Sequence, residues 1–226
     1  MRALAVLLIS SLFSATTFAA GIDLLSNKDA VGGLKQALTQ GASAAVGKLG
    51  VSNGFLNNPK VKIPLPDSLQ QVEGVLRSFG MSRQADELIE TMNHAAEAAV
   101  PEAKALLISA VKKMSIEDAK GILTGGNDAA TQYFRKNTSG PLAQKFLPIV
   151  KKATAKVGLA GKYNELAGKA SRFGLVDEKD ANLENYVTQK ALDGLYLMMA
   201  EEERAIRQDP VGQGSKLLQK VFGALR

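Results

Sequence analysis

Three residues whose side chains can bind metal ions occur together in one segment. Glu90, His94 and Glu97 are spaced four and three residues apart, which places them on successive turns of a helix. A helical di-metal site needs a carboxylate and a histidine from each of two helices, with further carboxylates from two more. Because the chain contains a single histidine, we favour an ion pair between His94 and the two carboxylates over a metal site.

A second group of carboxylates lies near the C-terminus. Glu201, Glu202 and Glu203 could supply a pair for acid and base work, such as glycoside hydrolysis. Neighbouring residues on a helix point about 100° apart, so these carboxylates do not face one another across a substrate. The pattern favours a solvated helix face with pairs such as Glu203 to Arg207. Glu202 lies near the apolar stripe, and we expect it to pair with a buried Lys or Arg.

Other catalytic arrangements are excluded or poorly supported. The absence of cysteine excludes thiol nucleophiles, cysteine-bound zinc and iron–sulfur clusters. Gly125 and Gly126 before a helix could cradle an anion, but no phosphate-loop lysine follows, so we interpret them as helix punctuation. The sequence contains no nucleophile elbow and no dinucleotide fingerprint. We therefore expect no catalytic residue, no cofactor and no metal.

Polar residues inside the expected helices are candidates for buried ion pairs or other interactions. Glu97 lies among alanines and should pack closely against a neighbouring helix, where an unpaired charge is expensive. We therefore expect a Lys or Arg partner for Glu97. The full set of candidates is Asn93, Glu97, Lys190, Glu202 and Arg207.

The first 19 residues have the pattern of a Sec-type secretory signal peptide. Arg2 precedes an apolar run over 3–13, and the small residues Thr17 and Ala19 predict cleavage after Ala19. The run is shorter than the ~20 residues of a bilayer span, which disfavours a membrane anchor. We expect a periplasmic or secreted protein with no transmembrane segment in the mature chain.

The elements that position these side chains are predicted to be helices. Apolar residues recur at spacings of three and four, which predicts an all-α protein. Leu195 and Met198 lie in a helix that is apolar over much of its girth and should be buried at the centre of a bundle. We expect helices over 29–48, 67–80, 82–99, 102–114, 116–123, 127–134, 138–157, 162–173, 183–208 and 216–225.

The expected organisation is a signal peptide (1–19), an N-terminal helix with an extended proline-containing arm (20–66), and an irregular multi-helix bundle domain (67–226). Pro64 and Pro66 force an extended course. A linker that lays Ile63 and Leu65 over the core is favoured, and a strap for a partner's groove is the alternative. The short amphipathic C-terminal helix is expected to dock on its own bundle, with a second copy or an anionic membrane as alternatives.

The charge balance argues against nucleic acid as a partner. The formal net charge is +6, and we expect the basic residues to be scattered among acidic ones. Phosphate binding along a nucleic acid needs a concentrated basic face. A weak attraction to anionic lipid head groups is the alternative.

Several strings together resemble a known family. They are KIPLP (62–66), MNHAAE (92–97), DAKGILTG (118–125), AATQYF (129–134), YVTQKALDGL (186–195), and Glu201-Glu202 followed by Ile206-Arg207. The chain resembles the bacterial domain-of-unknown-function family 4197 over nearly the whole mature sequence. The resemblance implies an exported, all-helical protein and no named activity. The chain departs from the family pattern at His94, where Arg is expected, and around 213–215, where an Arg-containing, Thr-rich string is expected.

Two classes of function follow from these observations. In the first, a non-enzymatic exported protein binds an apolar ligand or an envelope component, with Met92, Met114, Met198 and Met199 as an adaptable lining. In the second, it is a protein–protein interaction or scaffolding module of the periplasm. An enzyme of unrecognised type is the least favoured reading. The ligand, the partner and the oligomeric state stay open.

Overall fold

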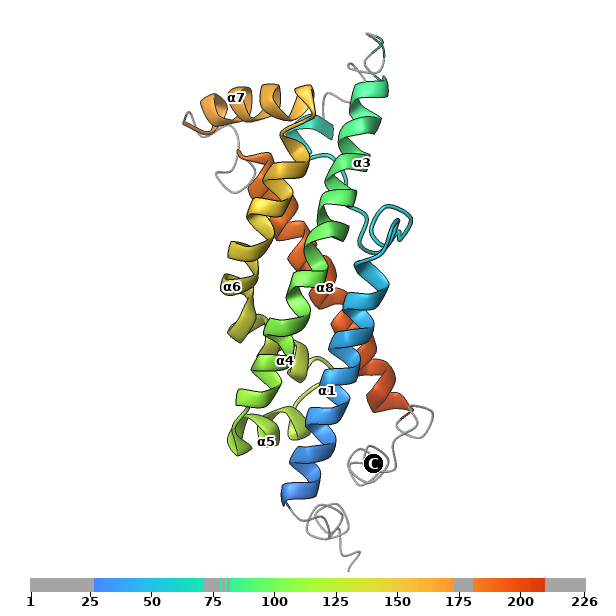
Figure 1. Ribbon diagram of the computed structural model, residues 1–226, viewed down its shortest axis with the longest axis vertical. Coiled ribbons are helices and arrows are strands. Elements are labelled where there is room, and N and C mark those ends of the chain that lie inside the picture. Colours follow the sequence, from blue (N-terminus) through green and yellow to red (C-terminus); the bar gives the residue numbers. More distant parts are fainter. Residues whose placement is uncertain (1–26, 71–77, 79, 81, 173–180, 210–226) are drawn as a thin grey trace, which may run out of the picture.

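The computed structural model describes residues 27–70, 78, 80, 82–172 and 181–209, and these form an elongated helical bundle. Helices α1, α3, α4, α6 and α8 run along the long axis, while α5 lies at one end and α7 at the other (Figure 1). The predicted all-α bundle is confirmed. The helix bounds are α1 (Asn27–Leu49), α3 (Ser82–Ala99), α4 (Ala103–Lys113), α5 (Ile116–Thr124), α6 (Ala129–Thr154), α7 (Gly158–Arg172) and α8 (Leu183–Gln208), with the 3₁₀ turn η1 (Val100–Glu102) between α3 and α4.

Helix α8 is the central element of the bundle. It contacts α1, α3, α6 and α7, and its apolar residues are buried along most of its length. Leu195 is fully buried and Met198 is 6% exposed, as predicted. The helix begins where Asn182 caps it by accepting the N–H of Asn185, because the Asn side chain supplies the acceptor that the first turn lacks. Both predicted ends of this helix are confirmed.

Local signals also explain α4 and α5. Pro101 lies in η1 at the start of this helical segment, where its missing N–H breaks no helical hydrogen bond. The Oγ of Ser115 accepts the N–H of Asp118 at 3.0 Å, and Oδ2 of Asp118 accepts the N–H of Ser115 at 3.0 Å. This reciprocal capping box starts α5, as the sequence predicts.

Helix α6 differs from the prediction, which split it into two helices before Pro141. The helix is continuous and contains both Pro141 and Pro148. Each proline lies on the exposed side of α6, and the carbonyls that lose their helical donor belong to the exposed residues Asn137 and Gln144. Water can donate to these carbonyls, so the helix tolerates both prolines.

The buried side of α6 explains how it packs. Residues at every fourth position are buried, namely Ala130, Phe134, Thr138, Leu142, Phe146, Val150 and Thr154. A ridge with this spacing is inclined to the helix axis. Helix α6 therefore crosses its neighbours at an angle, and its buried side turns gradually around the helix from one end to the other.

Other bounds differ only locally or lie outside the described residues. Helix α7 begins at Gly158, four residues before the predicted start. Residues 67–70 are helical, whereas most of the predicted helix 67–80, the signal peptide and the C-terminal helix 216–225 lie outside the described residues. In the described part of the chain, no helix combines the length and hydropathy needed to cross a membrane.

Candidate functional site

The first candidate site surrounds Glu97, a buried residue of α3 that holds the segment after α1. We call residues 50–60 the α1–arm loop. The carboxylate of Glu97 accepts the N–H of Phe55 and of Leu56 at Oε1, and that of Asn53 at Oε2, each at 3.0 Å. Nδ1 of His94 lies 2.7 Å from Oε2. One carboxylate therefore joins α3 to three backbone amides of the loop.

The backbone of this loop fits tightly around the carboxylate. Asn53 has a φ of 64°, a left-handed conformation that Asn adopts more readily than most residues. A Cβ on Gly54 would lie 2.5 Å from the carbonyl oxygen of Leu49, so only glycine fits there. Phe55 is fully buried, and a Cβ on Gly194 of α8 would lie 2.7 Å from its ring. Helices α3 and α8 thus fix the loop from two sides.

Opposing effects act on the acidity of Glu97. Burial raises its pKa, whereas the contact with His94 and the backbone hydrogen bonds from Leu56, Phe55 and Asn53 lower it. The net pKa lies below the ordinary value of 4.5. The carboxylate is therefore charged at neutral pH and acts as a hydrogen-bond acceptor for the loop.

Asn93, one turn from Glu97, holds the proline-containing arm in the same way. Its Oδ1 accepts the N–H of Ile63 at 2.8 Å, and its Nδ2 donates to the carbonyls of Ile63 and Ile89 at 2.9 and 2.8 Å. Ile63 and Leu65 are buried between the exposed Lys62 and Pro64. This placement agrees with the favoured interpretation of the arm as a linker laid over the core.

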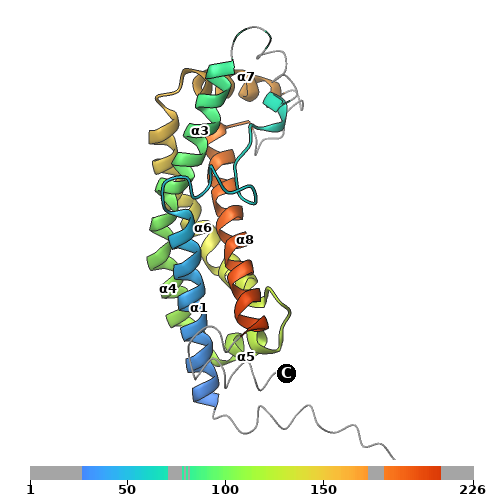
Figure 2. The same ribbon diagram turned by 90° about the vertical axis from the view of Figure 1, so that its right-hand side faces the viewer.

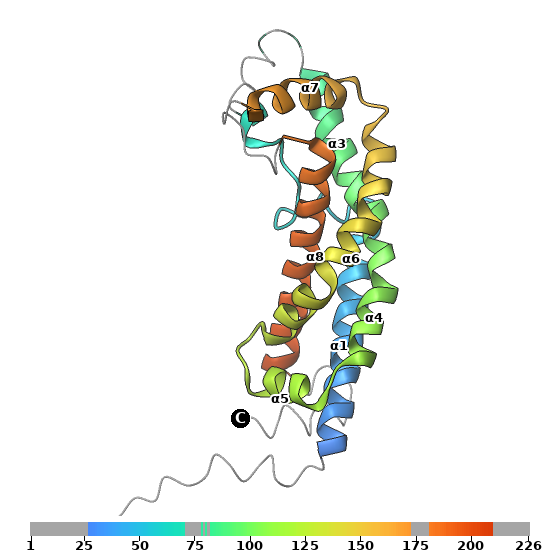
Figure 3. The same ribbon diagram turned by 90° about the vertical axis from the view of Figure 1, so that its left-hand side faces the viewer.

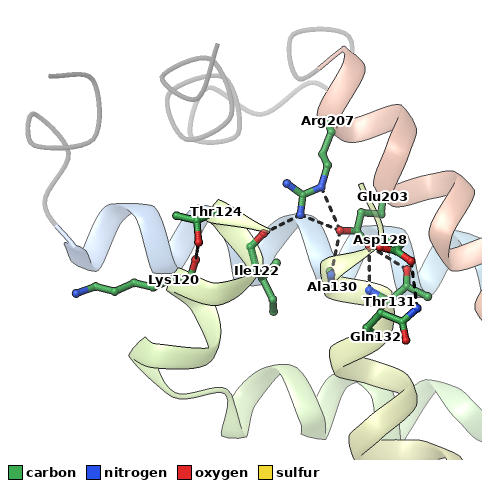
Figure 4. A network of polar contacts seen from close by, with 9 residues as sticks. All are labelled: Lys120, Ile122, Thr124, Asp128, Ala130, Thr131, Gln132, Glu203 and Arg207. Carbon is green, nitrogen blue, oxygen red and sulfur yellow. Dashed lines mark hydrogen bonds and ion pairs between the residues drawn. The ribbon is translucent and has the colours of Figure 1, made fainter. Parts of the chain in front are cut away.

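The second candidate site joins three helices at the α5 end of the bundle (Figure 4). Oε1 of Glu203 in α8 accepts the N–H of Ala130 at 3.0 Å, while Oε2 accepts the N–H and the hydroxyl of Thr131 at 2.9 Å each. Asp128 is the N-cap of α6, but its side chain makes no capping bond. Glu203 therefore caps α6 from another helix, where its negative charge also suits the helix dipole.

Arg207 completes this second site. Its Nη2 and Nε lie 2.8 and 3.1 Å from Oε1 of Glu203, and Nη2 also donates to the carbonyl of Ile122 in α5 at 2.8 Å. Both side chains are nearly buried, with Arg207 12% and Glu203 7% exposed. The pair was predicted on a solvated face, and that prediction is wrong. Glu203 continues a buried stripe of α8 through Tyr196, Met199 and Ile206, a signal that the sequence contains.

A small cavity lies beside Glu203, between α1, α6 and α8. Its volume is about 20 Å³, which is the space of roughly one water molecule. Apart from Glu203 and Thr131 its lining is apolar or glycine, and it includes Gly41, Phe134 and Met199. The carboxylate points its oxygens at the amides and Arg207, so its lone pairs are already used.

The remaining sequence candidates lie apart from these two sites. Glu202 pairs with the Nζ of Lys48 in α1, which is 58% exposed and so not the buried cation expected. Lys190 is exposed, with its Nζ 5.4 Å from the ring centre of Tyr186, and is not in a buried ion pair. The Lys or Arg partner predicted for Glu97 is replaced by backbone amides and His94.

The structure brings Asn93 and Glu97 together on α3, and it brings Arg207 to Glu203, a residue that was assigned to the solvated face. Gly54, Gly194 and Thr131 were not singled out from the sequence, because a close backbone approach or a cap supplied by a distant helix leaves no local pattern. Within the described residues, no cluster of three or more His, Asp or Glu side chains could hold a metal ion. Both buried carboxylates act as acceptors that fix backbone and neighbouring helices in place.

Comparisons with known proteins add the family. No curated protein and no solved structure matches the chain. A family model described as "Protein of unknown function (DUF4197)" matches residues 24–223, which is nearly the whole sequence. The chain therefore belongs to the DUF4197 family of proteins of unknown function.

Proposed function

We propose that this chain is an exported, non-enzymatic interaction module that binds a protein of the cell envelope through the α1–arm loop. The observation that carries the proposal is the anchoring of an exposed loop by a buried carboxylate. Three loop amides donate to Glu97 inside the protein. The loop conformation is therefore set before any partner arrives, which lowers the entropic cost of binding.

The outer surface of the loop has the mixture of groups that a protein partner needs. Val51 is 53% exposed, while Ser52, Asn53, Asn57 and Lys60 are exposed polar residues. Phe55 points inward and is fully buried, so the loop cannot shift without losing core contacts. Recognition residues are commonly found on loops that a rigid scaffold positions. An apolar side chain at the tip with polar neighbours suits a protein surface.

The alternative of an apolar ligand between the helices is less well supported. Met92, Met114, Met198 and Met199 are all buried in the packed core. The cavity that Met199 borders has a volume of only about 20 Å³. A lipid or a quinone would have to separate α1, α6 and α8 to enter there, at the expense of their packing. Surface recognition requires no such rearrangement.

Export is part of the proposal and rests on the pattern of the first 19 residues. Sequencing the N-terminus of the protein from fractionated cells tests it. Mature chains that begin at Ala20 in the periplasm or medium are expected. An intact Met1 in cytosolic protein would overturn this part of the proposal.

Crosslinking in cells tests the loop. A photoreactive amino acid replaces Val51, and a matched control places it at Ile116 of α5, which is 52% exposed. We expect a discrete protein adduct from position 51 that position 116 does not give. Equal adducts from both positions, or no adduct at position 51, would contradict the proposed loop interface.

A further inference from the structure

Helices α6 and α7 carry a strongly basic segment. From 129 to 164 the chain contains no Asp or Glu, and its basic residues are Arg135, Lys136, Lys145, Lys151, Lys152, Lys156 and Lys162. The expectation that basic residues are scattered among acidic ones is therefore wrong for this segment. Its charge is concentrated on two consecutive helices and on the turn between them.

Three of these lysines form a row on the outside of the bundle. Lys145, Lys152 and Lys156 are exposed, and at 100° per residue their helical positions fall within about 40° of one another. With a rise of 1.5 Å per residue, the row is about 16 Å long. Lys145 has one acidic neighbour, Glu102, at 3.7 Å. The lysine row therefore presents positive charge along the length of an outer helix.

Further basic residues extend the row. Lys151 and Lys162 are exposed, and together with Lys152 and Lys156 they form no ion pair with another residue that the structure describes. Pro148 is exposed and Ile149 is half-buried, and both lie on the turn between Lys145 and Lys152. A linear set of lysines with apolar groups between them fits the surface of a bilayer, where ammonium groups meet phosphates and apolar groups reach the upper acyl region.

We propose that the lysine row of α6 binds the phosphate head groups of an anionic membrane surface. Nucleic acid is a poorer fit, because the aromatic rings of α6 and α7 that could stack on bases, among them Phe134, Phe146 and Tyr163, are buried. Lysines are also flexible point charges, which suit a fluid array of head groups better than the fixed geometry of a folded acidic partner.

The placement of α6 gives this binding a second effect. Helix α6 and the α1–arm loop lie on opposite sides of the bundle (Figure 1), and the views from the two sides show the loop in front of the helices in Figure 2 and behind them in Figure 3. A membrane against α6 leaves the loop facing away from the lipid. The two surfaces can therefore be used at the same time.

Vesicle binding tests the proposal with the full chain and its natural N-terminus. The probes are vesicles of phosphatidylcholine alone and of an equimolar mixture with phosphatidylglycerol. The variant K145Q/K152Q/K156Q removes the row. The matched control K112Q/K113Q/K120Q removes three exposed lysines from α4 and α5, at the other end of the bundle. Circular dichroism melts establish that both variants are folded.

We expect the unaltered chain to bind the phosphatidylglycerol vesicles at low salt, and to bind more weakly as salt rises. Each lysine near an anionic surface accounts for about a fivefold change in partition, so the row variant should lose about 100-fold. The control should keep most of its binding. An equal loss in both variants, unchanged binding by the row variant, or no binding by the unaltered chain would overturn the proposal. Tighter binding of the row to a single-stranded oligonucleotide than to vesicles would also overturn it.

Discussion

Two buried glutamates in this bundle have similar chemistry and different neighbours. Glu97 in α3 accepts three backbone amides of an exposed loop, and its nearest side-chain partner is His94, which is 48% exposed. Glu203 in α8 accepts two amides and a hydroxyl at the start of a long helix, and its partner is the nearly buried Arg207. The first glutamate fixes a loop, and the second joins α5, α6 and α8.

The difference shows how the surroundings of a carboxylate determine which part of the fold depends on it. Around Glu97, water can reach the outer face of the loop once the contacts open. Around Glu203, the loss of the carboxylate leaves a guanidinium and two helix-start amides inside the protein. We therefore expect the Glu97 region to open locally and the Glu203 region to affect the whole bundle.

The largest effect is expected from Glu203→Ala. Removing one partner of a buried ion pair costs about 3–5 kcal/mol, because Arg207 stays buried without its counter-charge. Chemical denaturation measures the loss in the free energy of unfolding. As a control, Glu203→Leu combined with Arg207→Met should cost less than Glu203→Ala alone, because no buried charge remains. A loss below 1 kcal/mol for Glu203→Ala would show that water reaches Arg207.

A smaller and more local effect is expected from Glu97→Ala. Each buried amide left without an acceptor costs about 1–3 kcal/mol, but the loop can rehydrate, so the total should be about 2–3 kcal/mol. Hydrogen exchange should accelerate at the amides of Asn53, Phe55 and Leu56, while the amides of Ala130 and Thr131 keep their protection. Equal acceleration at both sets would contradict the distinction between the two regions.

Gly194→Ala tests the loop from the side of α8. The added methyl would lie 2.7 Å from the ring of Phe55, which forces one of them to move. Overpacking of this kind costs about 1–3 kcal/mol. Gly121→Ala in α5 is the control, since its added methyl meets nothing within 4 Å and should stabilise the helix by about 0.5–1 kcal/mol. Melting curves distinguish the two, and an unchanged melting temperature for Gly194→Ala would mean that Phe55 is not held in place.

The pH dependence sharpens the comparison further. Because the pKa of Glu97 is lowered in the folded protein, its charged form stabilises the fold at pH values above 4.5, and this contribution is lost as the pH falls through the lowered pKa. The difference in unfolding free energy between the unaltered chain and Glu97→Gln should therefore shrink on acidification. A difference that stays constant, or grows, would show that the ionised carboxylate is not what holds the loop.

The smallest effect is expected from Glu202→Gln. Glu202 pairs with Lys48 at the surface, and exposed pairs of this kind contribute about 0–1 kcal/mol. Denaturation at low and high salt should show little change. A loss comparable to that of Glu203→Ala would mean that the wrong neighbour has been assigned the structural role.

The sequence was sufficient where local patterns determine structure. The limits of α8 follow from the cap at Asn182 and from the proline after Asp209. The capping box of Ser115 and Asp118 likewise marks α5. Each of these signals acts within a few residues, so tertiary contacts are not needed to read it.

The failures come from contacts that local patterns do not encode. Pro141 suggested a helix boundary, but the freed carbonyl faces water and α6 continues. Glu97 was recognised as buried, yet its partners are mainly backbone amides, which every residue except proline possesses. Glu202 was preferred over Glu203 because the two are adjacent, and the choice depends on the crossing of α6 over α8 rather than on α8 alone.

The central position of α8 has a consequence for the order of assembly. Helix α1 is the first described element and α8 the last, and the two pack against each other. The buried side of α1 and the start of α6 both wait for residues 183–208, because Glu203 supplies the cap of α6. Contacts between such distant segments slow folding. A chain emerging from the ribosome therefore stays without its native core until almost its full length is made.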